Sequence, residues 1–143
     1  MEVYPADPAF LDCRGCVCAA LRRASRAVTQ HYELAFRGSG LRATQFTLLA
    51  VLTQTGPLPL SALANQAGME RTTLTRNLQL LEAKKWVRVQ ASDSDQRVRR
   101  VELTGAGRAA AARGMSAWRK AQVGIAPILR KHKLENLLGE TSD

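Results

Sequence analysis

The spacing of apolar residues predicts a long amphipathic helix near the start of the chain. Between about Asp12 and Phe36, apolar residues recur at intervals of three, four or seven, which places them on one face of a helix. The members of this stripe are Val17, Leu21, Ala24, Val28 and Ala35. Residues 1–11 contain two prolines and predict an irregular arm before the helix.

Further helices are predicted over residues 44–84. The segment 44–53 is apolar over most of its circumference and should therefore lie centrally, and the prolines of 56–59 end it. Residues 60–68 predict a short helix that ends at Gly68, because glycine readily takes the left-handed conformation found at helix ends. The segment 70–84 predicts the next helix, directly after this turn.

Two strands follow these helices. Residues 86–90 and 98–103 alternate between apolar and polar side chains, and the charged segment between them is typical of a turn. Thr104 is suited to cap a long helix that Pro127 kinks or ends, and a short helix around 131–138 completes the chain. Two short helices followed by a hairpin predict a mainly α chain with a small β hairpin, a winged helix-turn-helix.

The segment 70–84 has one face that suits contact with DNA. Three leucines occupy one side of the predicted helix, whereas hydroxyls, arginine and an amide occupy the other. In a helix-turn-helix the second helix enters the major groove, where arginine reads guanine, glutamine reads adenine, and threonine offers a hydroxyl and a methyl. The candidate contact residues are Arg71, Thr72, Thr73, Thr75, Arg76 and Gln79.

The tip of the hairpin carries charged residues that suit the minor groove or the phosphates. Asp95 can orient Arg97 or Arg99 through a bidentate ion pair, while the arginine still projects its charge toward a narrow groove. An exposed ion pair without a role in binding is the alternative. Lys84 and Lys85 are placed to contact DNA or to interact with the carboxyl end of their helix.

Composition and charge support a polyanionic partner. The 143 residues carry a net charge of +9, and residues 69–108 hold nine positive and five negative side chains. No run approaches the roughly 20 apolar residues that cross a membrane, and the N-terminus lacks a secretory signal pattern. The three cysteines are odd in number and clustered, unlike a disulfide framework, so we expect a cytoplasmic protein.

The chain resembles MarR-type transcriptional regulators over about residues 10–138. The resemblance rests on LSALANQAGMERTTLTRNLQLLEAKKWVRV and on SDSDQRVRRVELTGAGR. The second segment follows the wing signature of the family, whose positions here are Asp95, Arg97, Leu103, Thr104 and Gly107.

This resemblance implies a homodimer, usually a repressor, that binds a pseudo-palindromic double-stranded DNA operator. We expect residues 1–143 to form a single protomer, with dimerisation helices at about 10–36 and 105–138 and a winged-helix DNA-binding region at about 43–104. The family further implies a ligand or an oxidant that acts near the dimer interface.

The cysteines Cys13, Cys16 and Cys18 are candidates for that signal. On a continuous helix Cys13 and Cys16 would be about 60° apart, but Cys16 and Cys18 about 200° apart. The three thiolates could hold a soft metal or metalloid ion only if this turn unwinds. The alternative is that Cys16 and Cys18 are small core residues and that Cys13 has no specific role.

The first helix is similar to that of the OhrR-type peroxide sensors within this family. The resemblance implies that Cys18 is the reactive thiol and that Tyr32 contacts it across the dimer. The branch commonly has a tyrosine where this chain has Ala43. Oxidation of a cysteine, binding of a metal or metalloid, and binding of a small aromatic ligand remain three alternative signals.

Other classes of function have little support in the chain. We find no phosphate-binding loop, nucleophile elbow or cofactor motif, and we expect neither enzyme activity nor a cofactor. A winged-helix module that binds protein rather than DNA is the second rival. It would have no need for Thr72, Arg76 and Gln79 together with an arginine-rich hairpin.

Overall fold

The structure, a computed structural model, describes residues 1–91 and 97–134. The helices are η1 (Pro8–Gly15, a 3-10 helix), α1 (Val17–Phe36), α2 (Ala43–Thr55), α3 (Leu60–Ala67), α4 (Arg71–Ala83), α5 (Gly105–Gly124) and α6 (Ala126–Lys131). The strands are β1 (Leu58–Pro59), β2 (Val87–Ala91) and β3 (Arg99–Leu103). This order confirms the predicted mainly α fold with a small β element, a winged helix-turn-helix.

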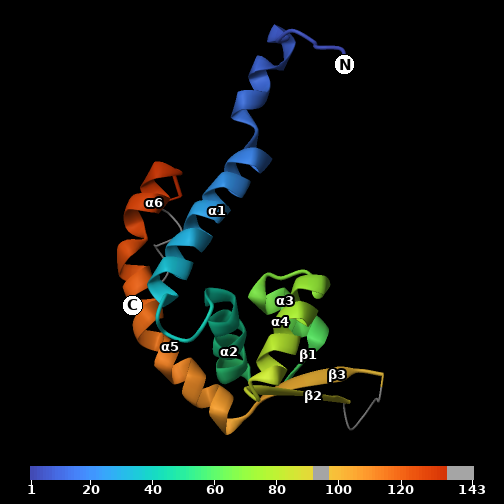
Figure 1. The fold of residues 1–143 in the computed structure, drawn as a ribbon, viewed down its shortest axis with the longest axis vertical. Helices are drawn as coiled ribbons and strands as arrows, with labels where there is room; N and C mark the ends of the chain where they lie inside the picture. Colours follow the sequence, from blue (N-terminus) through green and yellow to red (C-terminus); the bar gives the residue numbers. More distant parts are fainter. Residues whose placement is uncertain (92–96, 135–143) are drawn as a thin grey trace.

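Two groups of elements make up the molecule. The helix α1 packs against α5 and α6, and Figure 1 shows this pair of long segments on one side of the protein. The second group consists of helices α2, α3 and α4 and the sheet (Figure 1). Within this group α2 contacts α3, α4 and β3, and α2 also contacts α5 of the first group. The second helix is therefore central, as its apolar circumference predicted.

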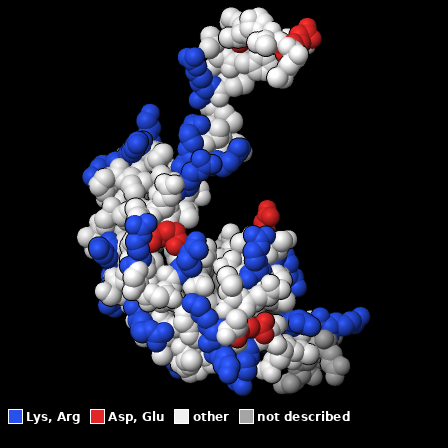
Figure 2. Space-filling model, in the orientation of Figure 1, with Lys and Arg blue, Asp and Glu red and all other residues white. Residues whose placement is uncertain are grey.

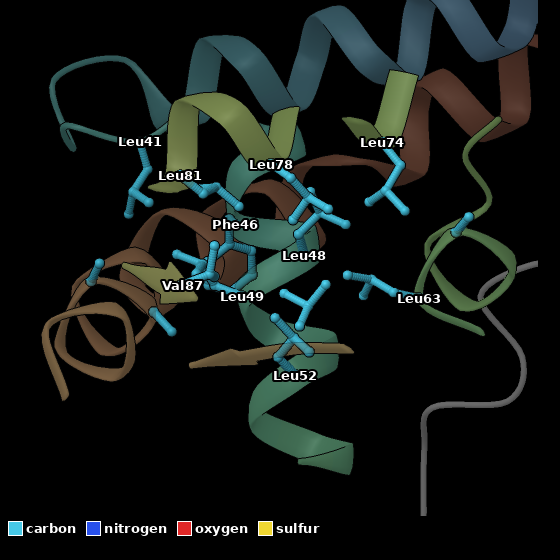
Figure 3. Close-up of a cluster of buried hydrophobic side chains, with 14 of the residues drawn as sticks. Leu41, Phe46, Leu48, Leu49, Leu52, Leu63, Leu74, Leu78, Leu81 and Val87 are labelled. Atoms are coloured by element: carbon cyan, nitrogen blue, oxygen red, sulfur yellow. The ribbon is translucent and has the colours of Figure 1, made fainter. Parts of the chain in front are cut away.

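The core of the second group consists of leucine side chains from several helices. Figure 3 shows these side chains converging on α2 from α3, α4 and β2. Leu48 and Leu49 on α2, Leu63 on α3 and Leu74 and Leu81 on α4 are all fully buried. Because α4 buries one leucine-lined face, its orientation relative to the rest of the domain is fixed.

A tight turn joins α3 to α4. Gly68 adopts a left-handed conformation with φ of 65° and ψ of 34°, as predicted for the end of this helix. The amide of Met69 then donates to the carbonyl of Ala64 at 2.9 Å, which closes the turn. This compact connection sets the angle between the two helices.

The sheet has one more strand than the sequence predicted. The hairpin of β2 and β3 is confirmed, and β1 pairs with β3 on the other side, which gives the antiparallel order β1-β3-β2. The two residues of β1, Leu58 and Pro59, lie in the segment that was expected only to end α2. A two-residue strand containing proline at a sheet edge has no periodic signal in the sequence.

The wing is joined to α5 by a set of short contacts around Thr104. Its hydroxyl donates to the carbonyl of Lys85 at 2.6 Å and accepts from the amide of Gly107 at 3.0 Å, so the predicted cap is confirmed. The amide of Thr104 also donates to the carbonyl of Trp86 at 3.1 Å. One residue thus connects the start of β2 to the first turn of α5.

The N-terminal region differs from the prediction. A continuous helix was expected from about Asp12, but α1 begins only at Val17, and a separate 3-10 helix occupies Pro8–Gly15. Cys16 lies between the two helices with an extended ψ of 113°. All side chains from Met1 to Cys18 are exposed, so no core packing holds this region in one continuous helix.

The C-terminal helices also differ in their limits. The helix α5 ends at Gly124, and α6 begins at Ala126 with Pro127 in its first turn, where proline is favoured. The short helix expected around 131–138 is wrong at its start, because α6 ends at Lys131 and residues 132–134 are not helical. Positions 135–138 of that prediction lie outside the described residues. No helix within the described ranges has the length and apolar character that crossing a membrane requires.

Candidate DNA-binding surface and thiol segment

The helix α4 presents the predicted polar face to solvent. Leu74, Leu78 and Leu81 are buried against the domain. All six predicted contact residues on this helix are exposed: Arg71, Thr72, Thr73, Thr75, Arg76 and Gln79. The apolar face thus holds the helix in place, and the opposite face is free to contact another molecule.

Five of these six residues line a single shallow hollow of about 390 Å³. They are Arg71, Thr72, Thr75, Arg76 and Gln79. Thr73 does not line the hollow, and its backbone carbonyl instead accepts from the side chain of Asn77 at 2.9 Å. The sequence-predicted set is therefore brought together except for Thr73, which lies to one side.

The polar groups of this hollow are mostly uncommitted within the protein. The Thr75 hydroxyl donates to the carbonyl of Arg71 at 2.9 Å, which uses its donor hydrogen and leaves its oxygen able to accept a hydrogen bond. Within the described residues, the side chains of Thr72, Arg76 and Gln79 form no hydrogen bond or ion pair. The first turn of α4 carries no acidic residue, so its amide groups can meet a phosphate.

The hairpin extends away from the helices (Figure 1), and its predicted contact arginines come from β3 and from the residues just before it. Arg97 and Arg99 are exposed there, and Arg99 pairs with Ala91 at the end of the sheet. Arg100 is instead half-buried and donates to the carbonyl of Pro57 at 2.9 Å, which ties β3 to the start of β1. The predicted partner Asp95 lies outside the described residues.

The lysines at the end of α4 have structural contacts. The Lys84 ammonium lies 4.5 Å from the centre of the Trp86 ring and 3.5 Å from the carbonyl oxygen of Gly40. Lys85 has a positive φ of 60°, and its carbonyl accepts the Thr104 hydroxyl. Both lysines therefore help to hold the exit from α4, through contacts with Trp86, Gly40 and Thr104 that differ from the predicted interaction with the carboxyl end of the helix.

Basic side chains are spread over the face drawn in Figure 2. They follow α1, the helices of the winged region and the outer end of the hairpin, with only a few acidic side chains between them. Near the hairpin, Glu102 pairs with Arg88 at 3.2 Å and accepts from Gln90 at 2.7 Å. The positive charge of β2 and β3 is partly balanced by Glu102, whereas the hollow on α4 has no acidic lining.

The three cysteines lie in an exposed segment and do not converge. Cys13 is in η1, Cys16 joins η1 to α1, and Cys18 is in the first turn of α1. All three are free and exposed, and the Arg22 guanidinium lies 3.2 Å from the Sγ of Cys18. Over residues 1–91 and 97–134 no three His, Cys, Asp or Glu side chains are grouped to hold a metal ion.

Tyr32, the predicted partner of Cys18, lies far along the same helix. Fourteen residues of α1 separate them by about 21 Å, so the two side chains cannot meet within one protomer. The Tyr32 hydroxyl donates to the side chain of Gln122 on α5, and burial raises the pKa of Tyr32 above its usual value of 10.0. His31, next to it, contacts the carbonyl oxygen of Ala121 at 2.9 Å.

A larger groove of about 750 Å³ was not foreseen from the sequence. It lies where the end of α1, the following loop, the start of α2 and Lys84 meet. Three of its lining residues are basic, namely Arg37, Arg42 and Lys84, and Glu33 is bound to Arg42 at 3.2 Å. The lining residues are separated by up to 55 positions, from Thr29 to Lys84, so no local motif in the sequence predicts the groove.

Comparison with known proteins agrees with this architecture. The family model described as the MarR family matches residues 41–98. The transcriptional regulator MosR of Mycobacterium tuberculosis, solved in complex with DNA, is 41% identical with a TM-score of 0.70, over 87% of this chain and 94% of that chain. No curated protein matches the chain significantly in a sequence search.

Two further solved structures are similar. BpsR of Bordetella bronchiseptica, whose DNA binding is regulated by 6-hydroxynicotinic acid, is 26% identical with a TM-score of 0.70, over 89% of this chain and 98% of that chain. Overoxidized AbfR bound to DNA is 25% identical with a TM-score of 0.65, over 90% of this chain and 92% of that chain.

The fold, the exposed face of α4 and these similarities agree with one another. The match to MosR extends well beyond the winged region and includes the long helices on either side of it. A family of this kind consists of regulators rather than enzymes. The chain belongs to the MarR family of DNA-binding transcriptional regulators.

Proposed function

We propose that the protein is a homodimeric repressor that binds a pseudo-palindromic operator and leaves it when Cys18 is oxidised. The observation that carries the DNA-binding part is the hollow on α4, lined by Arg71, Thr72, Thr75, Arg76 and Gln79. Helix α4 enters the major groove, and these side chains read base edges and phosphates. The hairpin contacts the flanking DNA through Arg97 and Arg99, oriented by Asp95, while Thr73 supplies a further contact beside the hollow.

The dimer follows from apolar surface that one protomer leaves exposed. On α1, Val17 is 71% exposed and Leu21 is 54% exposed, and Val123 near the end of α5 is 85% exposed. Burial of such side chains against a second copy is favourable by about 25 cal/mol per Å². We assign residues 10–36 and 105–138 to dimerisation and 43–104 to DNA binding, within a single protomer of residues 1–143.

Two winged units on one frame bind more tightly than either unit alone. The second half-site is reached at a high effective concentration once the first is occupied. The dimerisation helices, which form this frame, must then hold the two α4 helices about 34 Å apart, the length of one helical turn of DNA. A signal that changes this frame lowers the affinity for the operator.

Cys18 is the thiol that we assign to this signal. It is exposed in the first turn of α1, and the Arg22 guanidinium donates a hydrogen bond to its Sγ at 3.2 Å. Tyr32 of the same chain is too far along α1 to meet it, so their contact requires the second protomer. MosR and overoxidized AbfR, both solved with DNA, are regulators of similar fold.

The test of DNA binding uses the duplex that flanks the gene of this protein. Fluorescence anisotropy should give a dissociation constant at least 1000-fold lower for the operator than for an unrelated duplex. Affinity should also fall steeply with salt. Equal affinity for both duplexes at every salt concentration would favour the rival, a winged-helix module that binds protein.

The test of oxidation compares the wild-type protein with Cys18→Ser on the same operator. Organic hydroperoxide should release the wild type, and dithiothreitol should restore binding. The serine variant should stay bound under the same treatment. If the variant is released as readily as the wild type, Cys18 is not the trigger, whether or not DNA binding stands.

A small aromatic carboxylate is the second candidate signal, because the groove beside α1 favours an anion. Its volume of about 750 Å³ is within the range of small-molecule sites, and its basic residues outnumber the single lining carboxylate of Glu33. The probe is 6-hydroxynicotinic acid, to which BpsR responds. Calorimetry should detect binding that Arg37→Ala weakens, and an absence of heat would eliminate this candidate.

The remaining alternatives have less support. A metal or metalloid ion would need ligands from two protomers, since the described residues of one protomer provide no three-ligand group. A regulator that binds an operator acts where the DNA is, so we propose a cytoplasmic location.

A further inference from the structure

We propose that Cys13 and Cys16 form a second thiol site, which closes to an intrachain disulfide when the protein meets a hydroperoxide. This inference goes beyond the oxidation of Cys18 and does not require DNA binding. It arises from the departure noted above, namely that the cysteine segment is a 3-10 helix and a junction rather than the start of α1.

The backbone hydrogen bond places Cys13 and Cys16 one 3-10 turn apart, and small shifts of this turn then bring their Cβ atoms to the roughly 3.5–4.5 Å that a disulfide needs. The amide of Cys16 donates to the carbonyl of Cys13 at 3.1 Å, the i to i+3 bond of a 3-10 turn. One turn of this helix advances about 6 Å, and its side chains at i and i+3 are eclipsed. Disulfides span a similar distance of roughly 4.4–6.8 Å between Cα atoms.

The dihedral angles of Cys16 preserve this alignment. Its φ of −63° is helical, and φ sets the direction of Cβ relative to the preceding turn. Its ψ of 113° is extended, but ψ turns only the chain that follows. The Cβ of Cys16 is therefore oriented as at the next position of η1, on the same side as Cys13.

Cys18 has a different environment. It belongs to α1, beyond the extended junction, and its Sγ has the Arg22 guanidinium one turn further along. The pair Cys13 and Cys16 is separated from it by the change of backbone direction at Cys16. The segment therefore divides into a single thiol beside an arginine and a pair of thiols within one turn.

Closing the disulfide requires little rearrangement of the protein. The turn buries no side chain, and the space around Gly15 is open within 4 Å of where a Cβ would lie. Both thiols are exposed and free. Small shifts of this turn are thus not opposed by core packing.

The chemistry balances with a hydroperoxide as the oxidant. The thiolate of one cysteine attacks the distal oxygen, the O–O bond breaks, and the alkoxide that leaves takes up a proton to give an alcohol. The resulting sulfenic acid is attacked by the second thiolate, and the S–S bond forms with loss of water. Two thiols and one hydroperoxide become one disulfide, one alcohol and one water.

Trypsin provides a direct readout, because it cleaves after Arg14, between the two cysteines. Cys13 is then in the peptide 1–14, whereas Cys16 and Cys18 are both in the peptide 15–22. The experiment uses full-length Cys18→Ser, treated with one equivalent of organic hydroperoxide, alkylated under denaturing conditions and digested. Mass spectrometry should find the two peptides joined, two hydrogen atoms lighter than their sum, and separated by dithiothreitol.

The matched control is the double variant Cys13→Ser/Cys18→Ser, which retains Cys16 and should show no joined peptide. A non-reducing gel should keep the oxidised Cys18→Ser protein at the mass of one chain. Separate, alkylated peptides in Cys18→Ser would overturn the proposal, and so would a link only between two chains. In the wild type, a peptide 15–22 two hydrogen atoms lighter without any joined peptide would also overturn it, because Cys16 would then pair with Cys18.

The readout distinguishes this site from the proposed function. A failure of the Cys18 trigger is seen in DNA binding, whereas a failure of the Cys13–Cys16 site is seen in peptide masses. Either result can be obtained without the other.

Discussion

A β-carbon on Gly107 would overlap the carbonyl oxygen of Trp86, so the first turn of α5 and the start of the wing are in direct backbone contact. Thr104 adds hydrogen bonds to Lys85 and Gly107 on either side of this contact. The Leu-Thr-x-x-Gly signature, which carried part of the resemblance to the family, therefore has a structural cause. It joins the DNA-binding region to the long helix behind it.

We expect Gly107→Ala to destabilise the protein by about 3 kcal/mol, because the added methyl group must displace backbone atoms. The measurement is the free energy of unfolding in urea. Gly105→Ala is the matched control, since a methyl group there meets nothing within 4 Å. Equal losses in the two variants would contradict the role assigned to this contact.

The arginines of α4 and the hairpin should affect DNA binding differently. Arg76→Ala removes a base contact and should raise the dissociation constant for the operator by about 10- to 100-fold, with little change for unrelated DNA. Arg97→Ala removes a phosphate contact, so it should weaken both complexes and reduce the salt dependence by about one ion. Small and equal effects in anisotropy titrations would argue against these assignments.

Dimerisation should depend on the apolar face of α1. Leu21 is 54% exposed in the protomer, and burial of a leucine is worth about 1.5–3 kcal/mol, so Leu21→Glu should weaken the dimer at least tenfold in sedimentation equilibrium. Leu80 on α4 has nearly the same exposure, 53%, but lies in the DNA-binding region. Leu80→Glu should leave the dimer intact, and loss of dimer in both variants would refute the assignment.

Tyr32 should make the stability of the protein fall at high pH. Burial raises the pKa of its hydroxyl above 10.0 in the folded state, so the unfolded chain releases this proton first as pH rises. The contribution of the protonated hydroxyl is complete below pH 10 and is lost as pH rises through the folded pKa. The fall in the free energy of unfolding between pH 9 and 11 should be smaller in Tyr32→Phe than in the wild type, and parallel curves for the two proteins would contradict this.

The sequence was sufficient to predict the elements that bury a periodic apolar face. The leucines of α4 appear at helical spacing, and their burial directs the opposite face outward, so the exposed polar residues of this helix could be named in advance. Gly68 and Thr104 likewise mark the ends of helices by local chemistry that needs no knowledge of the rest of the chain.

Features that depend on distant residues could not be predicted in this way. The strand β1 exists because Leu58 pairs with Val101, and the groove forms because Lys84 meets the loop after α1. Arg100 follows the exposed Arg99 directly in the sequence, but its guanidinium donates to the carbonyl of Pro57, a contact that no local pattern predicts. In the cysteine segment, helical spacing suggested one continuous helix, whereas no buried contact selects that conformation over a 3-10 turn.

The contacts around Thr104 connect the wing, the end of α4 and the beginning of α5 rigidly, with little freedom to bend where these elements meet. Any rotation of α5 in the dimer would therefore move each DNA-binding region as a rigid body. A small rotation near the centre of the dimer would displace α4 by several ångströms at the DNA. We expect regulation to change the distance between the two α4 helices of the dimer. The structure of each DNA-binding region should stay unchanged. Operators with one or two base pairs inserted at their centre would then capture the released form better than the native spacing does.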